Sequence, residues 1–133
     1  AKYQPPTQSA FDVSENERND IYEKAWQEGG QAMLFAFTDL LTDEKANETA
    51  AEFVRNKIRK IVKDKRTAEL LCPTNHPIGT KRLCLDSNYF ETYNKENVSL
   101  IDVSNNPIEK IKVIPKGSIK DLGNSGNVSP FQR

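Results

Sequence analysis

The chain has 133 residues, of which 36% are hydrophobic and 29% charged, and a mean hydropathy of −0.71. This length suits one domain of ordinary size and is too short for two nucleotide-binding folds. Lysine plus arginine and aspartate plus glutamate number 19 each, so the net charge is zero. The composition therefore excludes binding of nucleic acid or anionic lipid through a global charge, and any cation that recognises a ligand must act locally.

The sequence offers no membrane segment and no metal site. Its longest apolar runs, such as residues 33–37, fall far short of the roughly 20 residues that span a bilayer, and no charged-then-apolar leader opens it. We therefore expect a cytoplasmic protein. Cys72 and Cys84 are the only cysteines, and their spacing leaves a disulfide open but gives a zinc site almost no support. Reduced, partly buried thiols are the default expectation.

The first part of the sequence predicts a connector followed by a helix. Residues 1–13 contain two prolines and no apolar period, which is typical of an extended connector. Ser14 and Glu17 have the form of a capping box, in which the serine hydroxyl accepts from a backbone N–H and the glutamate reaches back. We expect a helix over 15–28 that ends at Gly29–Gly30.

The middle of the sequence predicts two further helices. Residues 31–41 form the most apolar stretch, and their pattern leaves both a short buried helix and a strand open, with the helix favoured. Thr42 is a candidate cap for the next helix, whose apolar residues recur at spacings of three and four between 43 and 62. The acids of this helix lie in its first half and the bases in its second. That order complements the helix dipole and explains the basic run without a ligand.

The remainder predicts short elements. In chain order we expect a short helix at 64–71, a strand at 83–85, a brief helix at 87–94, strands at 98–103 and 108–114, and a flexible tail at 116–133. The fold class is therefore mainly α with a small β portion.

Lys81 and Arg82 are the strongest candidates for chemistry. They follow a turn marked by Pro77 and Gly79, which holds two adjacent cations beside an aromatic-rich short helix. An ammonium is a compact partner for phosphate, and a guanidinium offers several fixed donors to oxygen anions. On composition alone, two solvated loop cations are the commoner interpretation.

Other patterns carry less. His76 is the sole histidine and has no acid or nucleophile at a catalytic spacing, and no Gly-x-Gly-x-x-Gly, P-loop or catalytic triad occurs. Tyr89, Phe90 and Tyr93 have the spacing of an inward-facing helix side rather than a stacking platform. A basic set without interleaved aromatics keeps a nucleic-acid binder open as a third alternative: Arg55, Lys57, Arg59, Lys60, Lys63, Lys65 and Arg66.

A series of short motifs follows one order along residues 13–114. They are a Trp26 helix ending in Gly-Gly, Phe37-Thr38-Asp39-Leu40-Leu41, Asn47-Glu48-Thr49-Ala50, Pro77-Ile78-Gly79-Thr80-Lys81-Arg82, then Asp86, Tyr89, Glu91, Thr92, Tyr93 and Asn94, and finally Asn97-Val98 and Pro107-Ile108-Glu109. This order resembles the central region of the Baeyer–Villiger monooxygenases, class B flavoprotein monooxygenases of the cyclohexanone monooxygenase type. The resemblance covers roughly three quarters of the chain.

The resemblance implies a domain organisation. In that family this region is the helical insertion of the NADP-binding domain plus a short part of that domain's sheet. The chain would then divide into an extended connector at 1–13, a helical subdomain at 14–72, a segment re-entering the NADP domain at 73–115 with short strands and a short helix, and a flexible tail at 116–133.

The resemblance also implies roles for three residues. Lys81, with Thr80 in the same turn, would bind the cofactor, the lysine contacting the 2′-phosphate of NADP. Arg82 would be the catalytic residue: beside the flavin, it would stabilise the negatively charged flavin peroxide that attacks a ketone to give an ester or lactone.

The family's two dinucleotide fingerprints are absent from the sequence, and its resemblance stops after Ile114. We therefore expect a fragment that neither binds FAD or NADPH nor is active by itself. In the complete enzyme its partners would be the missing FAD and NADP domains and a small-molecule ketone, while the isolated chain could form a homodimer through exposed apolar surface. The alternative is a helical protein-interaction module without enzymatic activity that binds through the apolar surface of 31–41.

Overall fold

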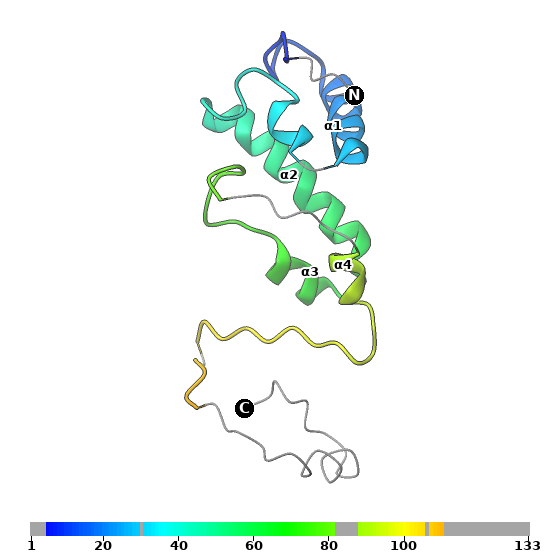
Figure 1. The fold of residues 1–133 in the computed structure, drawn as a ribbon, viewed down its shortest axis with the longest axis vertical. Helices are drawn as coiled ribbons and strands as arrows, with labels where there is room; N and C mark the ends of the chain where they lie inside the picture. The colour runs from blue at the N-terminus through cyan, green and yellow to red at the C-terminus, as the bar shows by residue number, and fades with distance from the viewer. Residues whose placement is uncertain (1–4, 30, 82–87, 106, 111–133) are drawn as a thin grey trace. The chain divides into compact units, whose positions relative to one another are not determined.

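The computed structural model describes residues 5–29, 31–81, 88–105 and 107–110. These ranges contain helices and no strand, which confirms a mainly helical fold. In chain order the elements are α1 (Glu15–Glu28), the 3₁₀-helix η1 (Ala32–Phe35), α2 (Glu44–Ile61), α3 (Lys65–Leu71) and α4 (Tyr89–Thr92) (Figure 1). The chain forms two units, Ala1–Leu100 and Ile101–Arg133, and the described residues of the second contain no helix or strand.

Helix α1 has the predicted bounds because both ends are capped locally. The backbone N–H of Ser14 donates to Glu17 Oε2 at 3.0 Å, and the serine hydroxyl accepts from the N–H of Glu17 at 3.4 Å. This reciprocal pair is the predicted capping box. At the other end Gly29 takes a φ of 73°, and its N–H donates to the carbonyls of Ala25 and Trp26. A glycine suits this end because other residues rarely adopt a positive φ.

Helix α2 is capped by Asp43, so the prediction that Thr42 caps it is wrong. Asp43 has extended backbone angles, and its Oδ1 accepts from the N–H of Ala46 at 2.8 Å. The hydroxyl of Thr42 instead donates to the carbonyl of Asp39 at 3.4 Å. The carboxylate gives the cap a negative charge at the positive end of the helix dipole, which a threonine cannot do.

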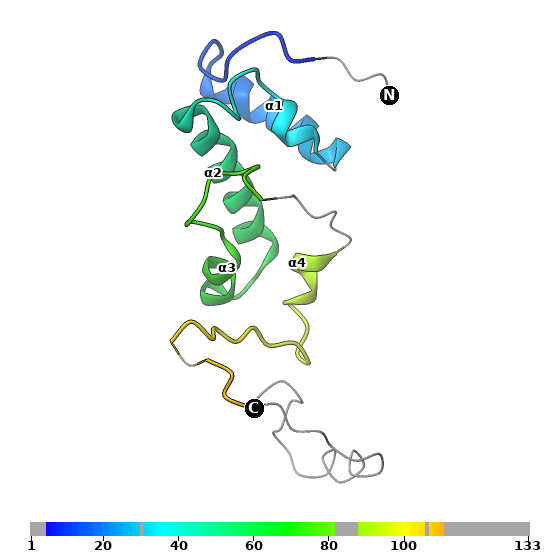
Figure 2. The same ribbon diagram turned by 60° about the vertical axis from the view of Figure 1, so that its left-hand side comes forward.

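Two apolar clusters pack against the two ends of α2. The first joins α1, η1 and the start of α2, and its fully buried large side chains are Tyr22, Phe37 and Leu40. The second joins the end of α2 to α3 through Ile58, Val62, Ala68 and Cys72, with two α4 aromatics packed against it. Figure 2 shows the same arrangement, with α1 crossing one end of α2 and α3 and α4 near the other.

Within residues 31–41 only the short η1 is helical, and turns follow it up to α2. The apolar side chains of this stretch still reach the core, because Met33, Phe37 and Leu40 are all buried. The apolar pattern that favoured a short buried helix over a strand thus arises from a 3₁₀ turn and the turns after it, which bring every third or fourth residue to the same side.

The strand expected at 98–103 is not formed, and residues 107–110 contain no strand either. A β-branched run becomes a strand only when a neighbouring strand accepts and donates its ladder hydrogen bonds. No such neighbour exists in the ranges that the structure describes. The expected strand at 83–85, the residues 111–114 of the second strand and the tail at 116–133 lie outside the described residues.

The segment before α1 packs against the rest of the first unit. Ala10 is fully buried, and its N–H donates to Asp39 Oδ1 at 3.0 Å. The hydroxyl of Ser9 donates to the other carboxylate oxygen of Asp39, and the N–H of Thr38 donates to the carbonyl of Gln8 at 3.0 Å. This packing rests on backbone groups and a small side chain, which leave no apolar period in the sequence. The predicted domain limits stay a prediction.

In the described ranges no helix is long and apolar enough to cross a membrane, and the cytoplasmic location stays a prediction. Cys72 is a free, buried thiol, and burial raises its pKa. Cys84 lies outside the described residues.

Candidate functional site

The predicted turn before Lys81 is present. The N–H of Thr80 donates to the carbonyl of Pro77 at 3.3 Å, and the Thr80 hydroxyl donates to the same oxygen at 2.8 Å. Gly79, the third residue of the turn, has a φ of 89°. A turn of this kind needs a positive φ at its third position, which a glycine adopts without strain. The hydroxyl of Thr80 is therefore used to close the turn.

A side chain at Gly79 would also meet two leucines, because the turn lies close to them. A Cβ added at this glycine would be 2.9 Å from Leu41 Cδ2 and 3.0 Å from Leu34 Cδ2. The backbone of the turn therefore rests directly on the segment between α1 and α2.

Asn47, in the first part of α2, holds the turn through its side-chain amide. Its Oδ1 accepts from the N–H of Ile78 at 3.0 Å, and its Nδ2 donates to the carbonyl of Ile78 at 2.9 Å and to that of Leu40 at 2.7 Å. The side chain is buried, with 6% of the residue exposed. Sequence reasoning noticed Asn47 only as part of a motif and missed this contact. A polar residue on the apolar face of a helix was the signal that could have found it.

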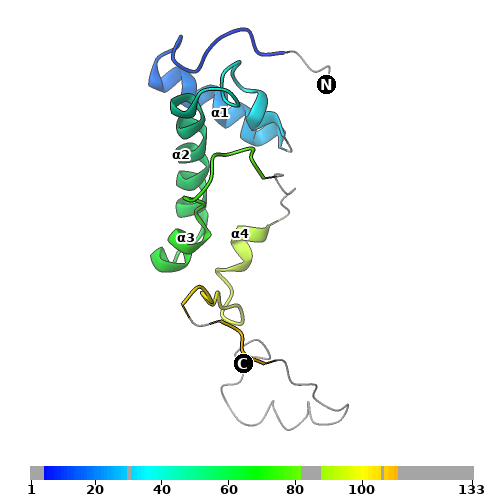
Figure 3. The same ribbon diagram turned by 90° about the vertical axis from the view of Figure 1, so that its left-hand side faces the viewer.

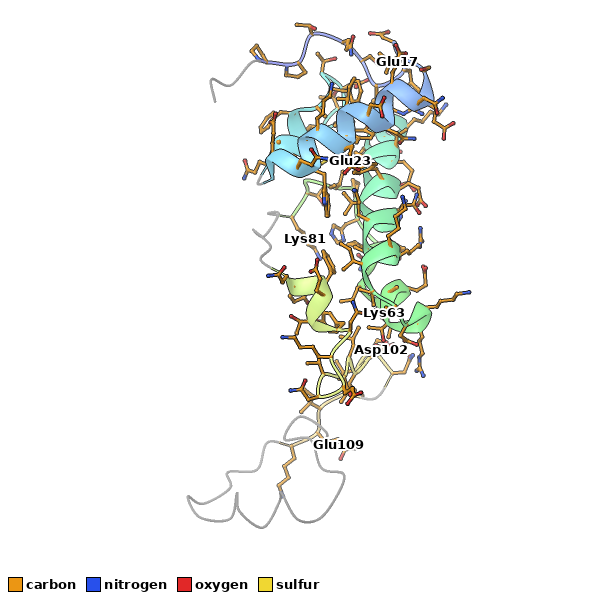
Figure 4. All side chains as sticks on the ribbon, turned by 90° about the vertical axis from the view of Figure 1, so that its right-hand side faces the viewer. Glu17, Glu23, Lys63, Lys81, Asp102 and Glu109 are labelled. Atoms are coloured by element: carbon orange, nitrogen blue, oxygen red, sulfur yellow. The ribbon has the colours of Figure 1, made fainter. Side chains whose placement is uncertain are left out.

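Lys81 directly follows this fixed turn and is exposed. Its side chain makes no hydrogen bond or ion pair with another described residue, and Figure 4 shows it between the level of α1 and that of α4. An exposed ammonium on a fixed backbone can bind an anion such as a phosphate without first breaking an internal ion pair. Arg82, the predicted catalytic residue, lies outside the described residues.

A shallow cavity of about 360 Å³ lies beside the turn, at the start of α2. The carboxylate of Asp43 lines it and already accepts from the helix N-terminus. A negative charge at this point disfavours a bound phosphate. Lys81 is not among the residues that line the cavity, which are Leu40, Leu41, Thr42, Asp43, Glu44, Asn47, Pro77, Ile78, Gly79 and Thr80.

The segment that carries Lys81 is fixed again after the undescribed residues 82–87. Asn94 Nδ2 donates to the carbonyl of Ile61 at 2.8 Å, and its Oδ1 accepts from the N–H of Lys63 at 2.8 Å. These bonds attach the end of α4 to the end of α2. Residues 77–81, which form the turn and carry Lys81, are called the cation turn below. Its two sides are tied to opposite ends of α2, each through an asparagine amide.

The aromatic set of α4 packs partly inward, as predicted. Phe90 and Tyr93 contact the second apolar cluster, while Tyr89 is 53% exposed. The hydroxyls of Tyr89 and Tyr93 lie 2.8 Å apart, and this hydrogen bond raises the pKa of Tyr93 to about 12.

His76 is half-buried, and its Nδ1 lies 2.6 Å from the Oδ1 of the adjacent Asn75.

The structure also bears on the two alternatives. Three large apolar residues of the 31–41 surface are buried in the core, which leaves Phe35 and Leu41 as its exposed large hydrophobics. In the basic set of α2, Arg55 and Arg59 pair with the acids of α2 and α3, and Lys57 pairs with Glu23. Both observations reduce the surface that a protein or nucleic-acid partner would need.

No group of three or more potential metal ligands occurs among the described residues. Lys81 suits one phosphate, but the sequence holds no glycine-rich turn that would bring a pyrophosphate onto a helix N-terminus.

The chain is similar to known monooxygenases over most of its length. It is 41% identical over 116 residues to 2-oxo-Δ3-4,5,5-trimethylcyclopentenylacetyl-CoA monooxygenase of Pseudomonas putida, covering 86% of this chain and 21% of the relative. It is 43% identical over 107 residues to cyclohexanone 1,2-monooxygenase of an Acinetobacter species, covering 79% of this chain and 19% of the relative. The chain thus spans about a fifth of the length of these relatives.

Solved structures agree with the sequence matches. An oxidized steroid monooxygenase bound to NADP superposes with a TM-score of 0.74 at 50% identity, over 76% of this chain and 19% of the other. No family model matches the chain. Identities near 40% over most of the chain, together with the shared helical fold, confirm the resemblance that its motifs indicated. The chain therefore belongs to the Baeyer–Villiger monooxygenases of the cyclohexanone monooxygenase type and corresponds to one segment of those enzymes.

Proposed function

We propose that this chain is a segment of an FAD- and NADPH-dependent monooxygenase that inserts oxygen beside a ketone carbonyl to give an ester or lactone. The observation that carries the proposal is the turn at 77–81, which presents an exposed lysine from a backbone fixed by Asn47. Support comes from the relatives, which include cyclohexanone and cyclopentanone 1,2-monooxygenases, and from a similar structure bound to NADP.

In this proposal Lys81 binds the 2′-phosphate of NADPH. The phosphate carries the charge that distinguishes NADPH from NADH, and a lysine ammonium is a compact partner for it. Thr80 contributes indirectly: its hydroxyl donates to the carbonyl of Pro77 and so closes the backbone turn that precedes Lys81. Arg82, the next residue along the chain, lies beside the flavin and stabilises negative charge that develops there.

When bound, NADPH supplies the hydride and FAD the ring that activates oxygen. The residues of this chain bind the nicotinamide cofactor by its phosphate and provide fixed positive charge. Glycine-rich turns for the two pyrophosphates must come from outside the 133 residues, since none occurs in them. By itself, the chain is therefore expected to bind no FAD.

A first experiment tests whether the dinucleotide-binding sites lie outside this chain. The purified 133-residue chain should show no flavin absorbance and no oxidation of NADPH with a ketone present. A bound flavin with turnover would overturn the proposal that the dinucleotide sites lie elsewhere.

A second experiment tests Lys81 in the complete enzyme that contains this segment. Lys81→Ala should lower kcat/KM for NADPH by about tenfold to a hundredfold and leave kcat/KM for NADH nearly unchanged, since only NADPH carries the phosphate. Lys24→Ala, which removes an exposed lysine of α1, is the matched control. An equal loss with both cofactors would contradict the assignment.

A third experiment tests Arg82. Arg82→Ala should abolish ester formation while NADPH still binds, because the guanidinium is assigned to the oxygenation step and not to cofactor binding. Ester formed at the wild-type rate would remove Arg82 from the site.

A further inference from the structure

Asn47 is the polar link between the cation turn and the body of the first unit. Within the described ranges, every hydrogen bond from residues 77–81 to another segment involves this side chain. Figure 3 shows residues 77–81, in bright green, running beside the blue-green α2. The contacts of Gly79 with Leu34 and Leu41 are apolar, and contacts of that kind do not fix a direction.

The geometry of the amide matches the backbone of Ile78 on both sides. Its oxygen accepts from the Ile78 N–H at 3.0 Å, and its nitrogen donates to the Ile78 carbonyl at 2.9 Å. The second N–H of the amide remains for the carbonyl of Leu40, at 2.7 Å. An amide is the side-chain group that provides both an acceptor and two donors in one plane, whereas a carboxylate only accepts.

Burial makes this arrangement sensitive to substitution. With 6% of Asn47 exposed, water cannot easily replace a lost bond, and the backbone groups of Ile78 and Leu40 would be left unpaired. The whole turn would then move to find other partners. Since Lys81 lies three residues after Ile78 and directly after the closed turn, its Cα would move with it.

We propose that Asn47 is a positioning residue that sets the place of Lys81 and thereby the preference of the enzyme for NADPH over NADH. This inference rests on the proposed function. Asn47 touches neither cofactor nor substrate in it, and it acts through the backbone of the turn. A displacement of about 1 Å in a binding group can cost a large factor in rate or affinity, so a small movement of the turn is sufficient.

The test compares Asn47→Asp with Asn56→Asp in the complete enzyme. The aspartate at 47 keeps the acceptor and loses both donors, so the ratio of kcat/KM for NADPH to that for NADH should fall by about tenfold or more. Asn56 is exposed on the same helix and accepts from Arg59 Nη1 at 3.2 Å, which an aspartate also does. Its variant adds the same charge and should keep the wild-type ratio.

A second variant covers the case in which Asn47→Asp does not fold. Asn47→Gln keeps every donor and acceptor but lengthens the side chain by one methylene, so it should displace the turn while preserving its hydrogen bonds. We expect a lower cofactor ratio together with slow hydrogen exchange at the Ile78 amide, measured in the 133-residue chain. Loss of stability alone would lower activity with both cofactors equally and leave the ratio unchanged.

The outcomes separate the two proposals. A wild-type enzyme with no preference for NADPH would overturn the function proposed for Lys81, and this inference with it. A wild-type preference that persists in a folded Asn47→Asp or Asn47→Gln enzyme would overturn the role of Asn47 alone. A reduced ratio in Asn56→Asp would attribute the effect to helix charge and would also count against Asn47.

Discussion

The two ends of α2 are stabilised by different interactions. At its start the helix packs against aromatic and aliphatic side chains of α1 and of the stretch after it, and one buried amide holds the cation turn. At its end the apolar cluster is smaller, Arg59 pairs with Glu69 of α3, and Arg55 pairs with two glutamates of α2 and donates to the carbonyl of Pro73. A buried contact therefore supports the Lys81 side, while a more exposed and charged contact supports α3. The first should respond to changes in packing, and the second to salt and pH.

The largest expected effect is at the start of α2. Tyr22 is fully buried, its ring lies 5.4 Å from that of Phe37 at an interplanar angle of 85°, and its hydroxyl lies 2.7 Å from the Thr49 hydroxyl. Tyr22→Ala should lower the free energy of unfolding by about 3–5 kcal/mol, measured by urea denaturation of the chain, because it leaves a cavity and removes the hydrogen bond to the Thr49 hydroxyl, which still donates to the carbonyl of Ala46.

Tyr22→Phe separates the two causes. It keeps the ring and removes only the hydroxyl, so the loss should be about 1 kcal/mol. If both variants lost the same free energy, the hydrogen bond rather than the packing would dominate this end of the helix.

Some of the contacts at the two ends of α2 can be predicted from the sequence, and others cannot. The capping box of Ser14 and Glu17 lies within four residues, and the helix begins where it indicates. The turn at Gly79 was predictable for the same reason, since glycine and proline act locally. The contacts of Asn47 with Ile78 and of Ala10 with Asp39 join residues 31 and 29 positions apart. No periodicity reports such a contact, because one buried amide or small residue leaves no repeating pattern.

The strand expected at 98–103 is the reverse case, because the sequence predicts an element that the structure does not form. Its β-branched residues favour an extended backbone, but a strand forms only with a partner, and the described residues contain none. These residues favour an extended backbone, but the described residues contain no neighbouring strand with which they could form a sheet.

The role of Arg82 was inferred from resemblance to a family and not from physical reasoning, and it stays a prediction.

The next effect concerns the other end of α2. Arg55 is 7% exposed, pairs with Glu48 and Glu52, and donates to the carbonyl of Pro73 at 3.3 Å. Arg55→Ala should lower the free energy of unfolding by about 1–2 kcal/mol, because both glutamates stay solvated while the carbonyl loses a donor. The loss should shrink in 1 M NaCl, since salt weakens the pairs already in the wild type.

That salt dependence distinguishes the two ends. Tyr22→Ala should cost nearly the same free energy at low and high salt, and the same urea titrations measure it. An Arg55→Ala effect that is equally insensitive to salt would show that packing of the guanidinium stem, and not charge, supports this end.

Asn94→Ala should have a smaller effect that is confined to α4. It removes the hydrogen bond that Asn94 donates to the Ile61 carbonyl and the one that it accepts from the Lys63 N–H. The free energy of unfolding should fall by about 1 kcal/mol. Amide hydrogen exchange should become faster in 89–94 and stay slow at Ile78, since the turn is held separately by Asn47. Faster exchange at both places would mean that the two attachments form one cooperative unit.

The smallest effect is a pH dependence located at the end of α2. A two-bond pair joins Glu69 to Arg59, with Oε1 2.7 Å from Nε and Oε2 3.1 Å from Nη2, and this contact holds the pKa of Glu69 below its ordinary value. A glutamate with a lowered folded-state pKa contributes stability above its unfolded-state pKa of about 4.3, and that contribution is lost as pH falls through the lower value.

Glu69→Gln should therefore reduce the difference in unfolding free energy between pH 7 and pH 3, and leave the value at pH 3 close to that of the wild type. Glu96→Gln, at an exposed glutamate outside the helices, is the control and should leave the pH profile unchanged. An unchanged profile in Glu69→Gln would mean that the exposed pair contributes nothing measurable, as many surface pairs do. The α3 end of the helix would then depend on its apolar cluster, and the contrast between the two ends would rest on Arg55 alone.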